Sequence, residues 1–178
     1  MRIIGGKLKG KTINPPAGYP ARPTTDFAKE GLFNILESEY ELAGFSLLDL
    51  FAGTGSISAE FISRGGKEAV CVEMNRRNAS FISKMHKSLG LAQIRTVHSN
   101  VFDFLKLCSR SFDFVFADPP YRLEGLDSIP DKIFENPTPI LSGQGYFILE
   151  HGGDYDFSSH PHFVKERHYG NVHFSFFA

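Results

Sequence analysis

Short apolar segments alternate with longer amphipathic segments along most of the chain. The short segments have the length and continuous hydrophobicity of buried strands; they are residues 46–51, 69–73, 94–98, 112–117 and 146–150. The longer segments predict helices over residues 55–64, 76–89, 101–107 and 123–134. Alternating strands and helices are typical of a mainly parallel sheet with helices on both faces. We therefore predict an α/β fold.

The two ends of the chain depart from this alternation. Residues 2–4 and 11–13 can pair as a small hairpin, and residues 24–26 carry the capping side chains and first-turn acid of a helix that runs to Glu37. Residues 163–168 and 172–177 flank a Tyr-Gly-Asn turn, which predicts a pair of antiparallel strands. The expected sheet therefore has seven strands, is mainly parallel, and ends in an antiparallel strand.

Composition limits the number of domains. A chain of 178 residues that is 42% hydrophobic can bury one core and is short for two. Residues 1–25 are rich in Gly, Pro and Lys, so we predict a basic N-terminal extension over 1–25 and a Rossmann-like domain over 26–178. No stretch approaches 18 apolar residues and no signal-peptide pattern opens the chain, so we expect a cytoplasmic monomer without a membrane partner.

Charge is unevenly distributed. The net charge of -1 argues against a protein that coats nucleic acid through a general positive field. Residues 1–25, however, contain no acid and five basic residues, namely Arg2, Lys7, Lys9, Lys11 and Arg22. This asymmetry favours contacts with phosphate groups, and a solvated basic tail is the alternative.

A hydrophobic strand runs into a glycine-rich turn at residues 47–55, LLDLFAGTG. Gly53 and Gly55 let the backbone approach a ligand and turn without a Cβ clash. Ser58 replaces the third glycine of the dinucleotide-binding pattern, which argues against a pyrophosphate cradle. S-Adenosylmethionine carries no phosphate, and loop amides together with Asp49 can bind its charged amino-acid end. A turn that uses glycine for geometry alone is the alternative.

Polar residues end the next two predicted strands. Glu73 follows the glycine-rich turn by about twenty residues, where a carboxylate can accept hydrogen bonds from both ribose hydroxyls. Asn100 follows the third strand, where its amide can bind an adenine edge or cap a helix. The predicted cofactor-binding residues are Asp49, Phe51, Gly53, Gly55, Glu73, Met74, Asn100 and Val101.

The sequence Asp118-Pro119-Pro120-Tyr121 directly follows the apolar segment 112–117. Two consecutive prolines exclude helix and hold their neighbours in a fixed geometry. The exocyclic amine of a purine is a poor nucleophile because its lone pair is delocalised into the ring. Asp118 and the Pro119 carbonyl can accept its two N–H bonds, orient it toward a methyl sulfonium and stabilise the developing positive charge. Tyr121 can stack on the base, so we predict Asp118, Pro119 and Tyr121 as catalytic residues.

Other residues with suitable chemistry have simpler interpretations. Glu150 ends a predicted strand and Asp154 lies in the following loop, and neither position requires a catalytic role. The histidines are scattered, and the two cysteines, Cys71 and Cys108, are far apart, so we expect no metal site.

Several segments together resemble one family over nearly the whole chain, the RsmD-type 16S rRNA (guanine-N2)-methyltransferases. They are residues 2–7, 22–26, 32–36, 48–55, 63–66, 72–73, 118–121 and 169–170. The DPPY sequence is shared with many DNA and RNA amino-methyltransferases, whereas RPTTD followed by LFNIL is more particular. The resemblance implies a Rossmann-like class I methyltransferase fold that uses S-adenosylmethionine. It also implies methyl transfer to guanine N2 of small-subunit ribosomal RNA, within the assembled or partly assembled subunit.

The resemblance also implies a substrate-binding surface. It places residues 22–26 over the site, near the incoming base or the methionine end of the cofactor; a helix cap is the alternative role for 24–26. The expected substrate-binding residues are Arg22, Thr24, Thr25, Asp26, Lys7, Lys9 and Lys11. After RPTTD the family usually continues with two arginines, whereas this chain has Phe27-Ala28-Lys29 and thus one basic residue, which weakens the case for RNA contacts by this helix.

Three other functions remain open on the sequence. A DNA or RNA adenine-N6 methyltransferase would use the same DPPY residues, but the chain has no obvious target-recognition domain. A dinucleotide-dependent oxidoreductase is disfavoured by the missing third glycine. A non-catalytic RNA-binding assembly factor is disfavoured by the intact Asp118 and Tyr121.

Overall fold

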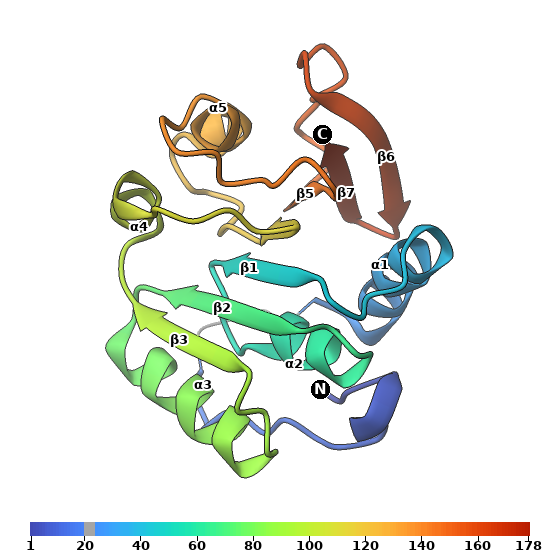
Figure 1. Ribbon diagram of the computed structural model, residues 1–178, viewed down its shortest axis with the longest axis vertical. Coiled ribbons are helices and arrows are strands. Elements are labelled where there is room, and N and C mark those ends of the chain that lie inside the picture. The colour runs from blue at the N-terminus through green and yellow to red at the C-terminus, as the bar shows by residue number, and fades with distance from the viewer. Residues whose placement is uncertain (20–23) are drawn as a thin grey trace.

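A seven-stranded sheet runs through the protein, with strand order β3-β2-β1-β4-β5-β7-β6 (Figure 1). The computed structural model describes residues 1–19 and 24–178. The strands are β1 (Ser46–Leu50), β2 (Glu68–Glu73), β3 (Ile94–His98), β4 (Phe114–Ala117), β5 (Phe147–His151), β6 (Phe163–Tyr169) and β7 (Val172–Phe177). The helices are η1 (Gly6–Leu8), α1 (Asp26–Glu39), α2 (Ser56–Ser63), α3 (Arg76–Ser88), α4 (Val101–Leu107), η2 (Leu126–Ser128) and α5 (Ile129–Phe134).

The first five strands of that order are parallel, and β7 pairs antiparallel with both β5 and β6. This confirms the predicted mainly parallel sheet with an antiparallel final strand. The predicted helix 123–134 is wrong in its first half, which contains a turn and the short 3₁₀ helix η2. Pro130 stands in the first turn of α5, where a missing N–H costs little, and it fixes where the α-helix begins.

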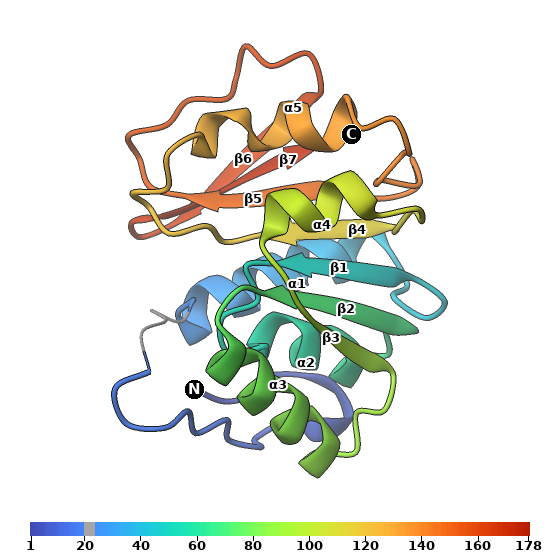
Figure 2. The ribbon, with the colours of Figure 1, turned by 90° about the vertical axis from the view of Figure 1, so that its left-hand side faces the viewer.

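The helices cover both faces of the sheet (Figure 2). On one face, α1, α2 and α3 pack on side chains such as Leu47, Phe114 and Ile148. On the other face, α4 and α5 pack on the residues between these, such as Leu48 and Val115. The alternation follows from the two-residue period of a strand, and it decides on which face each strand-end residue lies.

The predicted pairing of residues 2–4 with 11–13 is present as an antiparallel bridge between Arg2 and Thr12, with backbone hydrogen bonds from Ile3 to Lys11 (2.9 Å) and from Ile13 to Met1 (2.9 Å). Ile3 and Ile13 are fully buried in the α1–α2 side of the core. Glu60 of α2 receives backbone hydrogen bonds from Ile4 (2.8 Å) and Gly5 (2.7 Å). The first residues are therefore anchored to the sheet domain rather than projecting as a tail.

Lys29 completes a buried charge network around Glu60. Its Nζ donates to the Arg2 carbonyl at 2.7 Å and lies 3.8 Å from the Glu60 carboxylate, and Arg64 Nε donates to the same carboxylate at 2.7 Å. Burial lowers the pKa of Lys29, an effect that the Glu60 charge partly opposes. Lys29, the one basic residue of Phe27-Ala28-Lys29, is therefore not available to RNA, because its side chain is only 1% exposed.

Replacing Glu60 with Gln is expected to lower the free energy of unfolding by about 3–5 kcal/mol, because the Lys29 ammonium is left buried without its counter-charge. Glu37→Gln is the matched control, since Glu37 pairs with the same Arg64 but is 42% exposed, and we expect it to cost less than about 1 kcal/mol. Urea denaturation of the two variants measures the difference. Equal costs would contradict the assignment of Glu60 as the centre of the network.

Candidate active site

A cavity of about 930 Å³ opens at the carboxyl ends of the parallel strands, at the left-hand edge in Figure 2. Open α/β sheets bind their ligands at this edge. The cavity brings together residues predicted from separate motifs: Asp49, Phe51, Gly53, Glu73, Met74, Asn100, Val101, Asp118, Pro119, Tyr121, Thr24 and Thr25.

Four acids stand at the ends of four strands, and all face the α1–α2 side of the sheet. Asp49 follows Leu47 in β1 and Glu73 follows Cys71 in β2, each at a two-residue step. Asp118 continues the Phe114–Phe116 row of β4, and Glu150 continues the row of Ile148 in β5. Because side chains of one parity share a face, the four carboxyl groups converge on the cavity.

Asp49 is almost completely buried, and its Oδ2 accepts a hydrogen bond from Ser58 Oγ at 2.7 Å. Burial raises the pKa of Asp49 to about 7, although the Ser58 hydrogen bonds oppose the rise. A buried carboxyl group of this kind is poised to bind a cationic group, since a nearby positive charge favours its ionised form.

Glu73 shapes the glycine-rich loop as well as facing the cavity. Its Oε2 accepts from the Gly53 amide at 3.1 Å, and its Oε1 accepts from the Asn75 amide at 2.7 Å. Burial raises the pKa of Glu73, and these amides oppose the rise. The Gly53 carbonyl in turn accepts a hydrogen bond from the Tyr19 hydroxyl. Tyr19, which the sequence interpretation missed, thus ties the N-terminal segment to the loop.

The loop after β1 has an unusual backbone. Phe51 adopts a positive φ of 59°, a conformation that residues other than glycine rarely adopt and that is common at ligand sites. Gly55 also has a positive φ, of 72°, and a Cβ there would lie 2.9 Å from Ile82 and from His86 of α3. Gly55 therefore serves the close packing of the loop on α3, and it is not among the residues that line the cavity.

Asn100 caps a helix and also lines the cavity. Its Oδ1 accepts from the Phe102 amide at 2.9 Å and caps α4, while its side chain lines the cavity. Beside it, Met74, Val101 and Phe102 give this end of the cavity an apolar wall. An apolar slot edged by an amide group suits a purine ring.

Asp118 and Glu150 form a pair at the ends of β4 and β5. Burial raises the pKa of Asp118, and the charges of Glu150 and Asp49 raise it further. Burial likewise raises the pKa of Glu150 to about 7. The interpretation of Glu150 and Asp154 as acids without a place in the site is corrected, because both line the cavity and Glu150 is only 3% exposed. The register between β4 and β5, which no single motif shows, brings Glu150 to Asp118.

Thr24, one of the predicted substrate-binding residues, lines the cavity and contacts one of its acids. Its Oγ1 donates to Glu150 Oε2 at 2.8 Å, across 126 positions of sequence. Thr25 caps α1 by accepting from the Ala28 amide at 3.1 Å, so the cap role is present. Asp26 points away from the cavity to pair with Arg2 at 3.1 Å, and Arg22 lies outside the described residues.

Lys7, Lys9 and Lys11 are exposed and do not line the cavity. They surround η1, whose Leu8 amide donates to Ser63 Oγ at the last residue of α2, whereas the cavity lies at the start of that helix. An α-helix of eight residues is about 12 Å long. These lysines are thus placed for contacts with a large substrate, not with the reacting base.

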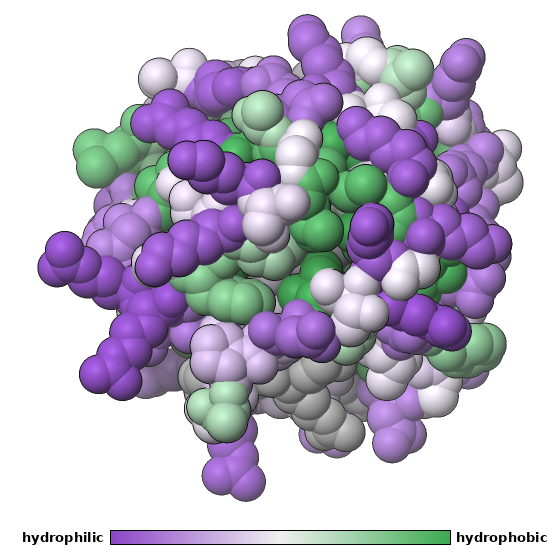
Figure 3. Space-filling model, turned by 90° about the horizontal axis from the view of Figure 1, so that it is seen from below, coloured by the Kyte–Doolittle hydropathy of each residue, from purple (hydrophilic) through white to green (hydrophobic). Residues whose placement is uncertain are grey.

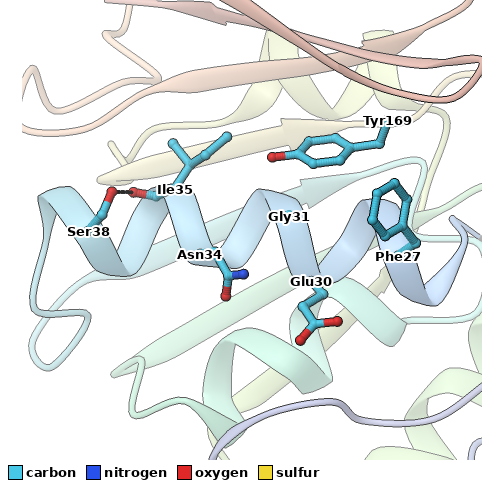
Figure 4. A pocket seen from close by; sticks show the side chains of 7 residues that line it. All are labelled: Phe27, Glu30, Gly31, Asn34, Ile35, Ser38 and Tyr169. Carbon is cyan, nitrogen blue, oxygen red and sulfur yellow. Dashed lines mark hydrogen bonds between the residues drawn. The ribbon is translucent and has the colours of Figure 1, made fainter.

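A second, smaller hollow of about 330 Å³ lies on α1 (Figure 4). Phe27, which stands where the family usually has an arginine, is 68% exposed, and its ring contacts that of Tyr169 edge-on with centroids 5.5 Å apart. Tyr169 covers Gly31, where a Cβ would lie 2.2 Å from the ring. The hollow is thus a packing feature of α1 against the β6–β7 turn.

The main cavity fits S-adenosylmethionine. Glu73 is placed for ribose hydroxyls, the Phe51–Gly53 loop and Asp49 for the amino-acid end, and the apolar wall at Val101 for the adenine. Among residues 1–19 and 24–178, no group of three or more His, Cys, Asp or Glu side chains could hold a metal ion. When bound, the cofactor would supply an electrophilic methyl group.

Replacing Glu73 with Gln is expected to weaken binding of S-adenosylhomocysteine about 10- to 100-fold, because hydrogen bonds to a charged acceptor contribute about 1.5–3 kcal/mol. Glu68→Gln, at the opposite end of β2 and paired with Arg110, is the matched control and should bind normally. Isothermal titration calorimetry measures both. An unchanged affinity in Glu73→Gln would remove this residue from the cofactor site.

Comparison with known proteins agrees with this geometry at the level of the fold. The structure of the hypothetical protein TTHA0928 from Thermus thermophilus superposes with a TM-score of 0.85 and 28% identity, covering 99% of this chain and 98% of that one. SMU.776, whose structure is a complex with SAH, shares the fold with a TM-score of 0.62 at 18% identity, over 76% of this chain and 45% of that chain.

Sequence comparison identifies the family. The family model described as "Conserved hypothetical protein 95" matches residues 1–178. Ribosomal RNA small subunit methyltransferase D of Escherichia coli (strain K12) is 36% identical over 136 residues, which are 76% of this chain and 68% of that protein. With a match over its whole length and the predicted motifs gathered around one cavity, this chain belongs to the RsmD-type family of ribosomal RNA small subunit methyltransferases.

Proposed function

We propose that this protein transfers a methyl group from S-adenosylmethionine to the exocyclic N2 amine of a guanine in small-subunit ribosomal RNA, acting as a monomer in the cytoplasm. The observation that carries the proposal is the position of Asp118, Pro119 and Tyr121. They leave β4 into the same cavity as Asp49 and Glu73. An acceptor for amine hydrogens therefore lies next to the site that fits the methyl donor.

The residues of the chain divide the chemistry between them. Asp118 and the Pro119 carbonyl accept the two N–H bonds of the amine and hold its nitrogen toward the methyl group. As the methyl group is transferred, the nitrogen becomes positively charged, and the Asp118 carboxylate stabilises that charge and can accept the proton that leaves. Tyr121 is 42% exposed at the cavity, where its ring can stack on the base.

The distribution of basic residues supports an RNA substrate. The exposed basic side chains of α3 are Arg76, Arg77, Lys84 and Lys87, and the helix contains no acid. Lys7 belongs to η1 and Lys9 and Lys11 follow it, and both η1 and α3 lie in the lower part of Figure 1. Seen from below, this face carries many hydrophilic side chains around a more apolar centre (Figure 3). Basic side chains next to a cavity for a base suit a structured RNA, whose phosphates they can contact outside the cavity.

The test is transfer of radiolabelled methyl groups from S-adenosylmethionine to small ribosomal subunits that lack the modification, with naked ribosomal RNA and DNA in parallel. Nucleoside analysis then identifies the product. We expect N2-methylguanosine from the subunits and less label on naked RNA, since the proposed substrate is an assembled or partly assembled subunit.

The alternative is adenine-N6 methylation of DNA or RNA, because an amine of adenine can use Asp118 and Pro119 in the same way. N6-methyladenine in either nucleic acid, without N2-methylguanosine, would keep the chemistry and overturn the proposed substrate.

The described residues contain no helix long and apolar enough to cross a membrane.

A further inference from the structure

The pair of carboxyl groups formed by Asp118 and Glu150 bears on the choice between guanine and adenine, which the DPPY residues leave open. We propose that Glu150 is a specificity-determining residue that accepts a hydrogen bond from N1–H of the target guanine, while Asp118 binds the neighbouring N2 amine. This inference rests on the proposed function and deepens it.

The sheet register places the two carboxyl groups side by side. Ala117 of β4 is the Cα partner of Leu149 of β5, so the next residues, Asp118 and Glu150, leave the two strands at the same level. Phe116 and Ile148, one two-residue step earlier, both face α1 and α2. Strands lie about 4.8 Å apart, which brings the two side chains to the same wall of the cavity as neighbours.

Thr24 fixes the orientation of the Glu150 carboxylate. Its hydroxyl donates to Oε2 at 2.8 Å in a buried position. Among residues 1–19 and 24–178, Thr24 is the hydrogen-bond donor to this carboxylate, and the side chain lines the cavity although the residue is only 3% exposed. A donor on a ligand in the cavity can therefore reach the other oxygen, Oε1.

The two purines present different edges to such a pair. Guanine has two parallel donors, N1–H and N2–H, whereas adenine has its N6 amine beside an N1 acceptor. Two adjacent carboxyl groups complement the guanine edge when both are ionised. Burial and their mutual charge raise the pKa of Asp118, and the two donors of guanine favour the ionised form against this effect. Opposite adenine, Glu150 would face the lone pair of N1, and two buried acceptors would oppose each other. Glu150 thus adds the discrimination that an amine-binding Asp118 alone lacks.

The experiment replaces the N1–H donor of the base with an acceptor; the same replacement also removes the 6-oxo group. 2-Aminopurine keeps the exocyclic 2-amino group of guanine but has an N1 acceptor in place of N1–H. Small subunits are reconstituted with guanine or 2-aminopurine at the position that the protein methylates. The kcat/KM of methyl transfer to the two kinds of subunit is then compared at pH 8. The wild-type protein should favour guanine about 10- to 100-fold, the discrimination typical of a lost paired hydrogen bond.

Glu150→Gln should reduce or invert that preference. Thr24 will hold the amide oxygen, so the amide NH₂ will face the base, where it opposes N1–H of guanine and donates to N1 of 2-aminopurine. We expect the guanine-to-2-aminopurine ratio to fall at least about tenfold. Glu150→Asp retains a carboxylate and should keep the preference at a lower rate. Glu135→Gln, an exposed acid at the end of α5, is the matched charge-removal control and should keep the wild-type ratio.

The outcomes separate this inference from the proposed function. Methylation of guanine with an equal rate on 2-aminopurine by the wild-type protein would overturn the role of Glu150 and leave the proposed function intact. So would a wild-type ratio in Glu150→Gln. Methylation of adenine and not of guanine would overturn both. The wild-type comparison needs no variant, so a Glu150→Gln protein that fails to fold does not prevent the test.

Discussion

Replacing Asp118 with Ala is expected to lower the rate of methyl transfer about a thousandfold while cofactor binding stays within about threefold of the wild-type protein. The side chain acts on the amine and on the charge that forms there, and one such electrostatic contact contributes about 10²–10³ in rate. Single-turnover transfer to unmodified small subunits measures the first quantity, and calorimetric titration with S-adenosylhomocysteine measures the second.

Folding gives an independent control on this variant. Asp118 lies beside Glu150 and Asp49, whose charges oppose its ionisation, so its removal relieves repulsion. The Tm of Asp118→Ala should therefore equal or exceed that of the wild-type protein. Asp103→Ala, on the exposed surface of α4, should retain full activity. Retained activity in Asp118→Ala would contradict the assigned chemistry.

Asp49→Asn is expected to stabilise the protein without cofactor, by about 2–4 kcal/mol at pH 8. Burial raises the folded-state pKa of Asp49 to about 7, whereas an unfolded aspartate has a pKa near 3.9. The native state thus favours the protonated group. Its stabilising contribution is complete below pH about 4 and is lost as pH rises to about 7. An amide mimics the protonated form at every pH, so the variant avoids this loss.

Urea denaturation between pH 5 and pH 8 measures the effect, and the advantage of Asp49→Asn should grow by about 2 kcal/mol across that interval. Asp113, just before β4, is the matched control, because its pKa is shifted in the opposite direction. Burial raises its pKa, but hydrogen bonds from Ser46 and Ser142 lower it more. Its stabilisation is present above the unfolded pKa and is lost as pH falls, so Asp113→Asn should be destabilising at pH 8. A pH-independent difference for Asp49→Asn would contradict the burial effect.

Most strands of the parallel sheet can be predicted because their apolar runs are buried on both faces, as in β1 and β2, whereas β3 at the sheet edge is only partly buried. Residues 69–73 and 94–98 are expected as strands, and β2 and β3 end at Glu73 and His98 as predicted. The first half of 123–134 cannot be predicted as a turn by periodicity alone. The pairing of the two N-terminal segments can also be predicted, but the bonds from Ile4 and Gly5 to Glu60 of α2 cannot, because they join distant parts of the chain.

The residues that a local motif marks lie together in the cavity, as Asp49, Glu73 and Asp118 illustrate. Glu150 escapes sequence interpretation because its position depends on the register of β4 and β5, which is a contact between distant segments. The burial of Lys29 cannot be predicted either, because a lysine on a helix is normally exposed and only the fold shows the counter-charge of Glu60. A single sequence thus predicts the fold more completely than it predicts which contacts the charged residues make.

Four carboxyl groups at one end of the sheet also bear on turnover. They attract a sulfonium more strongly than a neutral thioether, so the electrostatic part of binding weakens once the methyl group has moved. The site therefore disfavours its own by-product relative to fresh cofactor. Repulsion among these acids makes the empty protein less stable. We expect the same negative charges to limit product inhibition, because they attract the sulfonium and not the thioether.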